Sequence, residues 1–277
     1  MPIQDDPRAN DAGDPASCIS ALERERDVLR DRCAMLETLI AQHDLLPLPP
    51  EALRVRVGGW EDPDHFLAVG RKIYWDVKRL LGLAGRTLPE FRSILDFGCG
   101  CGRLTRYFRS SETQRVTACD IDAESIRWCQ DNLAGTGVAF SHTAAMPRLP
   151  FDASAFDLVL AISVFTHLPE AMQFEWLDEL ARVIRPGGIL LASTHGETLL
   201  PRDVPDEVRS AFLESGFYYS KGSGTPGLPD FYQTAYHRPE YVASRWRNFD
   251  LVCELPRGIN NHQDAYVFSR RIPGDGV

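Results

Sequence analysis

The sequence predicts an α/β fold built on a doubly wound sheet, and two adjacent patterns carry this prediction. A predicted buried strand at residues 94–97 leads directly into Gly98, Gly100 and Gly102. Glycine in such a turn lets the backbone bend sharply and lets a ligand approach closely. Residues 103–108 then carry apolar side chains at helical spacing, so the turn is expected to open a helix. A strand, a glycine turn and a helix form the ligand-binding end of a doubly wound sheet.

The acidic residues around the glycine turn discriminate between two nucleotide-type cofactors. A dinucleotide fingerprint spaces its glycines as G-x-G-x-x-G, whereas the third glycine here comes one residue early. Asp96 lies two residues before Gly98, where a carboxylate would repel a pyrophosphate but would suit a cationic ligand. A second short strand, residues 116–120, ends in Asp120, where an acid would bind a ribose diol. These charges disfavour a nicotinamide oxidoreductase.

With the glycine turn, Asp96 and Asp120 at these spacings, the chain resembles the class I S-adenosylmethionine-dependent methyltransferases. Further motifs of that family are Leu149-Pro-Phe151 and the run Phe156-Asp-Leu-Val159. The resemblance covers residues 90–200 by specific motifs and 240–270 by pattern. It implies a Rossmann-like sheet of seven strands, mostly parallel with the last strand antiparallel, and S-adenosylmethionine as cofactor. The chain also resembles a bacterial subgroup associated with glycan and natural-product biosynthesis.

The remaining elements follow in the order that this family implies. Residues 138–140 and 156–162 are expected to be the third and fourth strands. Apolar positions at helical spacing predict a helix over 170–184, which Arg185-Pro-Gly-Gly188 would end. The all-apolar run 189–192 is typical of a central parallel strand buried on both faces. Residues 249–253 and 264–269 are expected to form the closing antiparallel pair.

The family resemblance also implies which residues bind the cofactor. Asp96 would order the turn and bind the methionine amino group, Asp120 would accept from the ribose hydroxyls, and Ile121 would pack on the adenine. Many relatives have an acid that contacts the adenine amino group, but this chain has Thr143-Ala-Ala-Met146 there. Backbone groups of Ala145 or Met146 would replace it. The full predicted set is Asp96, Gly98, Gly100, Gly102, Asp120, Ile121, Ala145, Met146 and Ser163.

Two histidines are candidates for the catalytic base. The methyl group of a sulfonium is intrinsically electrophilic, so an enzyme needs chiefly to align the acceptor with it. An alcohol acceptor must also lose its proton, whereas a carboxylate acceptor needs no base. His167 follows the fourth strand and is either a base or a structural hydrogen-bonding group. His195 follows the fifth strand on the acceptor side and is the strongest single candidate.

A long insertion at residues 197–238 is expected to cover the acceptor. Segments of this length inside a compact domain are usually functional lids or disordered, and the aromatic content argues against disorder. Tyr218, Tyr219, Tyr232 and His237 are its candidate substrate-binding residues. His262 lies in the polar stretch 258–264, which either faces the acceptor pocket or is a plain polar hairpin.

The N-terminal region differs from the rest of the chain. Residues 1–16 are expected to be a disordered tail, and residues 17–48 a helix, a candidate coiled coil, followed by a linker. This helix would either mediate a homodimer or partner docking, or pack on its own domain and cap its active site. Residues 49–277 would form the methyltransferase domain with its lid insertion.

Composition restricts the partners and the compartment. The 277 residues carry a formal charge of −9, which argues against nucleic-acid binding. No run of 18 apolar residues or signal pattern occurs, so a cytoplasmic protein without a membrane span is expected. The seven cysteines are expected to be reduced. Cys99 and Cys101 lack the further ligands of a metal site, so no metal is predicted.

The sequence thus predicts methyl transfer to an oxygen of a sugar or another small natural-product metabolite. One alternative is methylation of a peptide carboxylate or amine, with the N-terminal helix engaging the substrate or its carrier. The other is a non-catalytic scaffold that binds the cofactor and assembles with a partner. Loss of activity after removal of the N-terminal segment would favour the first alternative.

Overall fold

The computed structural model describes residues 19–20, 22–23, 25–30, 32, 46–222 and 224–272. The chain divides into two units, Met1–Leu45 and Leu46–Val277. The described residues of the first unit are helical and exposed. They lie within the predicted N-terminal helix, whose pairing as a coiled coil stays a prediction. The predicted tail at residues 1–16 lies outside the described residues.

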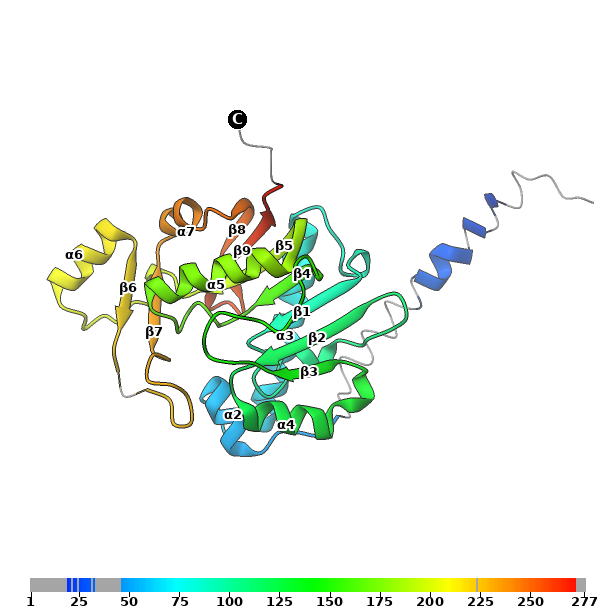
Figure 1. Cartoon of the computed structure of the whole chain (residues 1–277), viewed down its shortest axis with the longest axis horizontal. Coiled ribbons are helices and arrows are strands. Elements are labelled where there is room, and N and C mark those ends of the chain that lie inside the picture. The colour runs from blue at the N-terminus through cyan, green and yellow to red at the C-terminus, as the bar shows by residue number, and fades with distance from the viewer. Residues whose placement is uncertain are drawn as a thin grey trace, which may run out of the picture. The chain divides into compact units, whose positions relative to one another are not determined.

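The second unit is an α/β domain, shown in Figure 1. Its main sheet has seven strands in the order β3-β2-β1-β4-β5-β9-β8. The strands are β1 (Ser93–Phe97), β2 (Arg115–Asp120), β3 (Ala139–His142), β4 (Phe156–Ala161), β5 (Ile184–Thr194), β8 (Phe249–Ile259) and β9 (Gln263–Arg270). The helices are α2 (Glu51–Gly58), α3 (Pro63–Leu83), α4 (Ala123–Asn132), α5 (Glu170–Val183), α6 (Asp206–Ser215) and α7 (Pro239–Arg245), and a second sheet holds β6 (Phe217–Ser220) and β7 (Thr234–His237).

The strand directions confirm the predicted topology of the main sheet. Strands β1 to β5 pair in parallel, and β9 runs antiparallel to both of its neighbours, β5 and β8. The chain leaves β1 toward β2 and β3 on one side and returns to β4 and β5 on the other. In such a sheet the place where the direction of winding changes, here between β1 and β4, is where ligands bind.

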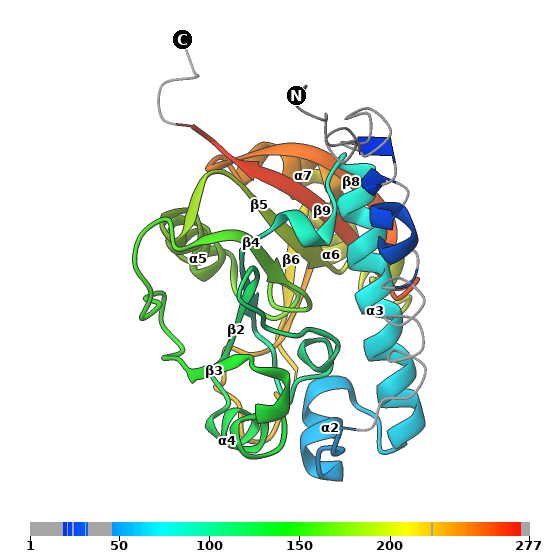
Figure 2. The same cartoon turned by 90° about the vertical axis from the view of Figure 1, so that its right-hand side faces the viewer.

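Helices cover both faces of this sheet, as Figures 1 and 2 show. Alternate residues of a strand point to opposite faces, so the apolar runs of β1, β4 and β5 supply two cores. Ile94, Leu158 and Ile189 pack in the core that includes α3 and α4. Their neighbours in sequence, Leu95, Val159 and Leu190, pack in the core that includes α5 and α7. Burial on both faces explains why these strands are almost wholly apolar.

The segment after the glycine turn does not form the predicted α-helix. It contains only a 3-10 turn at Thr105–Tyr107 before the chain becomes extended at Phe108. Arg106 is buried in this turn and donates to the carbonyl oxygens of Leu46 and Pro47. The apolar side chains of residues 103–108 therefore pack inward from one short 3-10 turn, and no longer helix forms there.

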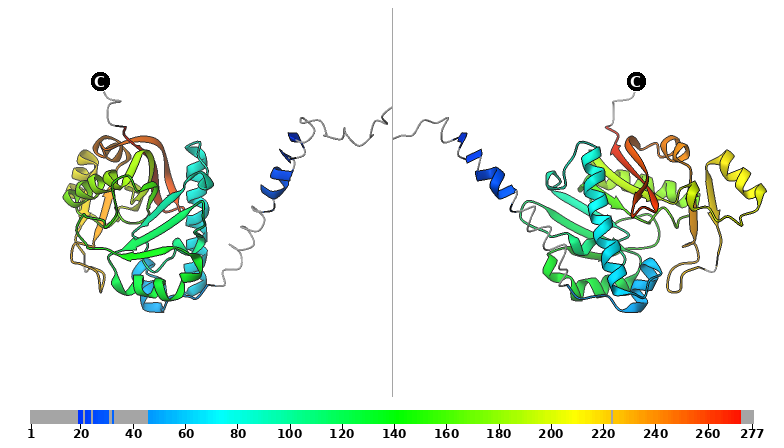
Figure 3. Two further views of the ribbon diagram at one scale, coloured as in Figure 1. Left: turned by 45° about the vertical axis from the view of Figure 1, so that its right-hand side comes forward. Right: turned by 180° about the vertical axis from the view of Figure 1, so that it is seen from behind.

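The insertion has secondary structure of its own. It holds a 3-10 turn at Glu197–Leu199, helix α6 and the antiparallel pair β6–β7, which lie to one side of the main sheet in Figures 1 and 3. The Gln233 and Ala235 amides donate to the carbonyl oxygens of His167 and Thr166. The insertion is thus attached to the segment that follows β4. In the part of the chain that the structure describes, no helix is long and apolar enough to cross a membrane.

Candidate active site

A cavity lies at the carboxyl ends of β1, β2 and β4, where the winding of the sheet reverses. It is bordered by the glycine turn, by α2, by the segment between β3 and β4, and by the insertion. Six residues of the predicted cofactor set line it: Gly98, Gly100, Asp120, Ile121, Ala145 and Ser163. The structure therefore brings together, at one cavity, residues that lie up to 65 positions apart in the sequence.

The glycine turn is shaped for close approach of a ligand. Gly98 and Gly100 have φ angles of +80° and +53°, a region that residues with a side chain rarely adopt. A Cβ atom on Gly100 would lie 2.6 Å from a methyl carbon of Val57, and one on Gly98 would collide with Val164. These two glycines keep the cavity open at its base. That the methionine part of S-adenosylmethionine lies along this turn stays a prediction.

Gly102 has a different role from the one predicted. Its φ angle is +80°, but it does not line the cavity. A Cβ atom here would lie 2.6 Å from the Leu133 side chain and 3.3 Å from the Cys129 sulfur. The third glycine therefore allows the turn to pack against the end of α4 and does not face the ligand.

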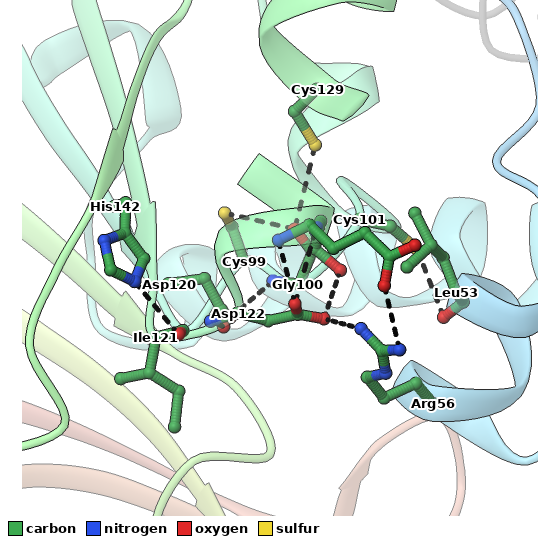
Figure 4. Close-up of polar contacts among 12 residues, drawn as sticks. Leu53, Arg56, Cys99, Gly100, Cys101, Asp120, Ile121, Asp122, Cys129 and His142 are labelled. Atoms are coloured by element: carbon green, nitrogen blue, oxygen red, sulfur yellow. Dashed lines mark hydrogen bonds and ion pairs between the residues drawn. The ribbon is translucent and has the colours of Figure 1, made fainter. Parts of the chain in front are cut away.

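Asp120 is held at the edge of the cavity by two backbone donors. The Gly100 amide donates to one carboxylate oxygen at 2.7 Å, and the Asp122 amide donates to the other at 2.8 Å, as Figure 4 shows. Burial raises the pKa of this carboxyl above its usual value. Each oxygen retains a lone pair for another donor. The geometry suits the predicted contact with ribose hydroxyls.

Asp96 lies beneath the glycine turn and does not line the cavity. Its side chain is buried and accepts a hydrogen bond from the Thr105 hydroxyl at 2.5 Å. Burial raises the pKa of the Asp96 carboxyl to about 6, against the effect of the Thr105 hydrogen bond. Its contact with Thr105 orders the turn, while its predicted contact with the methionine amino group stays a prediction.

Arg56 is a site residue that the sequence analysis missed. It lines the cavity from α2 and forms ion pairs with Asp122 at 2.7 Å and with Glu124 at 3.0 Å (Figure 4). Burial alone would raise the pKa of Asp122, but hydrogen bonds from Arg56 and Ser125 hold it below its usual value. These ion pairs fasten α2 to the start of α4, directly beside Asp120. No local pattern reveals a contact that spans 66 residues.

Ala145 and Met146, the two residues predicted to contact the adenine through backbone groups, differ in their position relative to the cavity. Ala145 lines the cavity together with Thr143. Met146 does not line it, and 59% of its side chain is exposed. Of these two backbone candidates, Ala145 therefore lies at the cavity and Met146 does not, while the contact with an adenine stays a prediction.

The two candidate bases lie near each other, and neither of them lines the cavity. The His167 and His195 rings have their centres 6.2 Å apart, and the His195 and His262 rings 6.0 Å apart. Burial lowers the pKa of His167 to about 4, and burial together with the imidazoles of His167 and His262 lowers that of His195 to about 3. Both are therefore neutral near pH 7. His167 also contacts the Gln233 carbonyl oxygen through Nδ1 at 2.7 Å, as the structural alternative anticipated.

Of the four aromatic candidates in the insertion, only Tyr232 lines the cavity. Its ring stacks on His167 with ring centres 4.1 Å apart. The Tyr219 hydroxyl donates to the Phe231 carbonyl oxygen, and Tyr218 stacks on Tyr236. His237 is wholly buried, and its Nε2 contacts the Gln173 side chain at 2.8 Å. The prediction that His237 lines the substrate pocket is wrong, because it belongs to the packing of β7 on α5.

A second cavity, of about 240 Å³, lies beside the first. It is bordered by α3 and by the turn between β8 and β9, and it includes His262, whose contact with a substrate stays a prediction. Arg103 and Ser163 line both cavities. The Ser163 hydroxyl donates to the Gln263 side-chain oxygen at 3.0 Å, and Ser163 has a φ angle of +62°. The described residues contain no cluster of three or more metal-ligating side chains.

Residues 94–188 match the protein family described as methyltransferase domain. This match places a methyltransferase domain in the second unit, in agreement with the predicted class I fold and with the predicted cofactor, S-adenosylmethionine. The five described cysteines are free. The predicted subgroup in glycan and natural-product biosynthesis is not distinguished by these matches.

Among curated proteins, the chain is similar to two O-methyltransferases. The malonyl-(acyl-carrier protein) O-methyltransferase of Salmonella typhimurium is 36% identical over 122 residues, which make up 43% of this chain and 44% of that protein. The ubiquinone biosynthesis O-methyltransferase of Parvibaculum lavamentivorans is 30% identical over 182 residues, 64% of this chain and 61% of that protein. The chain thus spans about half the length of the curated relatives it matches.

Solved structures share the fold. The 1,6-didemethyltoxoflavin-N1-methyltransferase of Burkholderia thailandensis, solved with S-adenosylhomocysteine, has a TM-score of 0.53 at 19% identity and covers 82% of this chain and 92% of its own. The PH0226 protein of Pyrococcus horikoshii has a TM-score of 0.51 at 20% identity, over 72% of this chain and 91% of its own. At this identity the likeness shows the architecture and not the acceptor.

Proposed function

We propose that the protein transfers the methyl group of S-adenosylmethionine to an oxygen of a small acceptor, a sugar or another natural-product metabolite. The observation that carries this proposal is the pair of adjoining cavities. The first combines Gly98, Gly100 and Asp120 at the carboxyl ends of the strands, and the second shares Arg103 and Ser163 with it. An oxygen acceptor is supported by the two similar proteins that are named as O-methyltransferases.

In this proposal the chain's residues hold both reactants and exclude water. The cofactor, when bound, supplies an electrophilic methyl group, so the protein's main task is alignment. Gly98 and Gly100 allow close approach, Asp120 holds the ribose, and Ile121 with Ala145 borders the adenine. Positioning of two reactants can lower a barrier by about 7–11 kcal/mol in the best cases. Leu228, Phe231 and Tyr232 of the insertion close the cofactor cavity and keep it dry.

The proposal assigns proton removal to the histidine group. His262 lines the second cavity, and His195 lies next to it with its Nδ1 atom enclosed and without a described hydrogen-bond partner. A neutral imidazole can accept a proton from an acceptor hydroxyl as the new carbon–oxygen bond forms. The low pKa of His195 makes it a weak base, and only His262 of the two lines the second cavity, so in this scheme His262 accepts the proton.

A second candidate is methylation of a carboxylate or amine on a peptide or carrier protein. One observation favours it: a similar protein is named for a substrate carried on acyl-carrier protein. In this version the N-terminal segment, residues 17–48, would engage the carrier or form a homodimer. The five free cysteines fit a reducing compartment, and we therefore place either activity in the cytoplasm.

Calorimetric titration with S-adenosylhomocysteine tests the proposal. We expect the wild-type protein to bind and Asp120→Ala to bind about 10- to 100-fold more weakly, because a ribose contact to a charged group is lost. Asp131→Ala, which removes an exposed acid on α4, is the matched control and should bind like wild type. A folded wild-type protein that binds no S-adenosylhomocysteine would contradict both the enzyme and the cofactor-binding scaffold.

A further inference from the structure

Arg103 is a buried cation placed between the two cavities. It follows the glycine turn directly and is only 9% exposed, yet it lines both the cofactor cavity and the second cavity. Within residues 46–222 and 224–272, no carboxylate or carbonyl oxygen forms an ion pair or hydrogen bond with its guanidinium. Burying a charge without a partner is costly, so a buried guanidinium in this position points to a partner outside the chain.

Other arginines near the site are paired. Arg56 has Asp122 and Glu124, and Arg106, which is more deeply buried than Arg103, donates to the carbonyl oxygens of Leu46 and Pro47. The position of Arg103 is therefore not explained by the general packing of arginines in this region. Its guanidinium lies over the Trp60 ring, 5.6 Å from the ring centre, a contact that orients the group without neutralising it.

The guanidinium faces open space and not the protein core. None of its nitrogen atoms is among the enclosed polar atoms that lack a hydrogen-bond partner, so unpartnered nitrogens reach the cavities. Asp96 attracts Arg103 only at a distance, because its carboxylate is engaged by Thr105. The residues that line the second cavity include no acid, and Asn260, Asn261 and Gln263 supply further polar groups there.

We propose that Arg103 is the receptor for a carboxylate group at the junction of the two cavities. A planar guanidinium binds a carboxylate through two parallel hydrogen bonds, which a lysine does not reproduce. The carboxylate comes either from the methionine part of the cofactor or from the acceptor, since Arg103 borders both sites. The inference rests on the proposed function. It adds the requirement that a bound ligand carry a carboxylate, which the glycine turn and Asp120 do not impose.

The first test compares two cofactor analogues by calorimetry. S-Adenosylhomocysteine has the carboxylate, and 5′-methylthioadenosine has the same nucleoside and thioether without it. If the cofactor supplies the carboxylate, Arg103→Gln weakens S-adenosylhomocysteine binding about tenfold or more and leaves 5′-methylthioadenosine binding unchanged. Arg103→Lys should recover part of the loss. Arg127→Gln, an exposed arginine on α4, is the matched control.

The second test uses the protein saturated with S-adenosylhomocysteine. It is titrated with 4-hydroxybenzoate and with the methyl ester of that compound, which keeps the hydroxyl but has no charge. If the acceptor supplies the carboxylate, the wild-type protein prefers the acid to the ester. Arg103→Gln then loses that preference while its affinity for S-adenosylhomocysteine stays at the wild-type value.

Three results would overturn the inference. In the first, Arg103→Gln and Arg103→Lys, both folded by circular dichroism, change neither comparison. In the second, they weaken S-adenosylhomocysteine and 5′-methylthioadenosine equally, which is the result of a purely structural role. In the third, the wild-type protein binds no S-adenosylhomocysteine, and the proposed function fails as well. In the first two cases the proposed function still holds, provided that the wild-type protein binds S-adenosylhomocysteine and that Asp120→Ala weakens this binding.

Discussion

At the scale of single residues, the buried carboxyl of Asp96 makes the stability of the domain depend on pH. Its pKa is about 6 in the folded protein against an ordinary 3.8, with burial as the main cause. Between these two values the folded state holds a proton that the unfolded state has lost. The Asp96 contribution to the unfolding free energy is therefore fully present below pH 3.8, falls as the pH rises to about 6, and is constant above.

This contribution can be measured by comparison with Asp96→Asn, which retains an acceptor for the Thr105 hydroxyl. We expect the wild-type protein to lose about 2 kcal/mol relative to the variant between pH 4 and pH 7, as the size of the pKa shift requires. Urea unfolding at a series of pH values provides the measurement. A difference between the two proteins that does not vary with pH would show that Asp96 is not protonated in the folded state.

Which site residues could be predicted depended on how local their signal was. Asp120, Gly98 and Gly100 lie in short motifs whose spacing reflects the backbone geometry of the turn, and all three line the cofactor cavity. Arg56 and Asp122 are brought together by folding, across 66 residues, so no sequence window contains their contact. Residue type also misled: His237 looks like a ligand-binding histidine and is a packing group.

At the scale of elements, the turn from Gly98 to Gly102 combines two separate demands on glycine. At Gly102 a side chain would be both strained, at a φ angle of +80°, and too close to the buried Leu133. Gly85, at a φ angle of +70°, has nothing within 4 Å of the position of a Cβ atom. A comparison of Gly102 with Gly85 therefore separates the effect of backbone strain on stability from the effect of packing.

We expect Gly102→Ala to lower the unfolding free energy by about 2–4 kcal/mol, the sum of backbone strain and overpacking. Gly85→Ala should cost only about 1 kcal/mol, from the strained backbone alone. Denaturant unfolding of both variants provides the comparison. Equal losses would mean that Leu133 moves aside freely and that the third glycine is needed for its φ angle only.

The elements themselves were predicted with unequal success, for reasons of length and burial. The central strands β1, β4 and β5 of the main sheet are buried on both faces, so their apolar residues stand out in the sequence. The helical spacing after the glycine turn was too short to separate an α-helix from the single 3-10 turn at Thr105–Tyr107. In the insertion, strands of four residues, β6 and β7, carry too few positions for any period to be visible.

At the scale of the whole molecule, the boundary between the two units falls after Leu45. We expect removal of residues 1–45 to leave the affinity for S-adenosylhomocysteine within about twofold and the unfolding midpoint unchanged, because the cofactor cavity is lined by residues of the second unit. Calorimetry and thermal unfolding of the shortened protein provide the check. Loss of S-adenosylhomocysteine binding would show that the N-terminal segment contributes to the cofactor site.

The position of the cut decides whether this experiment is informative. A cut after residue 48 would also remove the carbonyl oxygens of Leu46 and Pro47, which accept hydrogen bonds from the buried Arg106. The resulting instability would imitate the loss of a docking segment. With the cut after residue 45, light scattering of the intact and shortened proteins reports cleanly on the predicted homodimer.

The border shared by the two cavities has a kinetic consequence. Arg103 and Ser163 belong to both, so a cofactor bound in the first cavity forms part of the lining of the second. Under the proposed function, we expect the acceptor to meet a complete site only after the cofactor has entered, and S-adenosylhomocysteine to stay bound while the product remains. The two substrates would add in a compulsory order, with S-adenosylhomocysteine as the last product to leave.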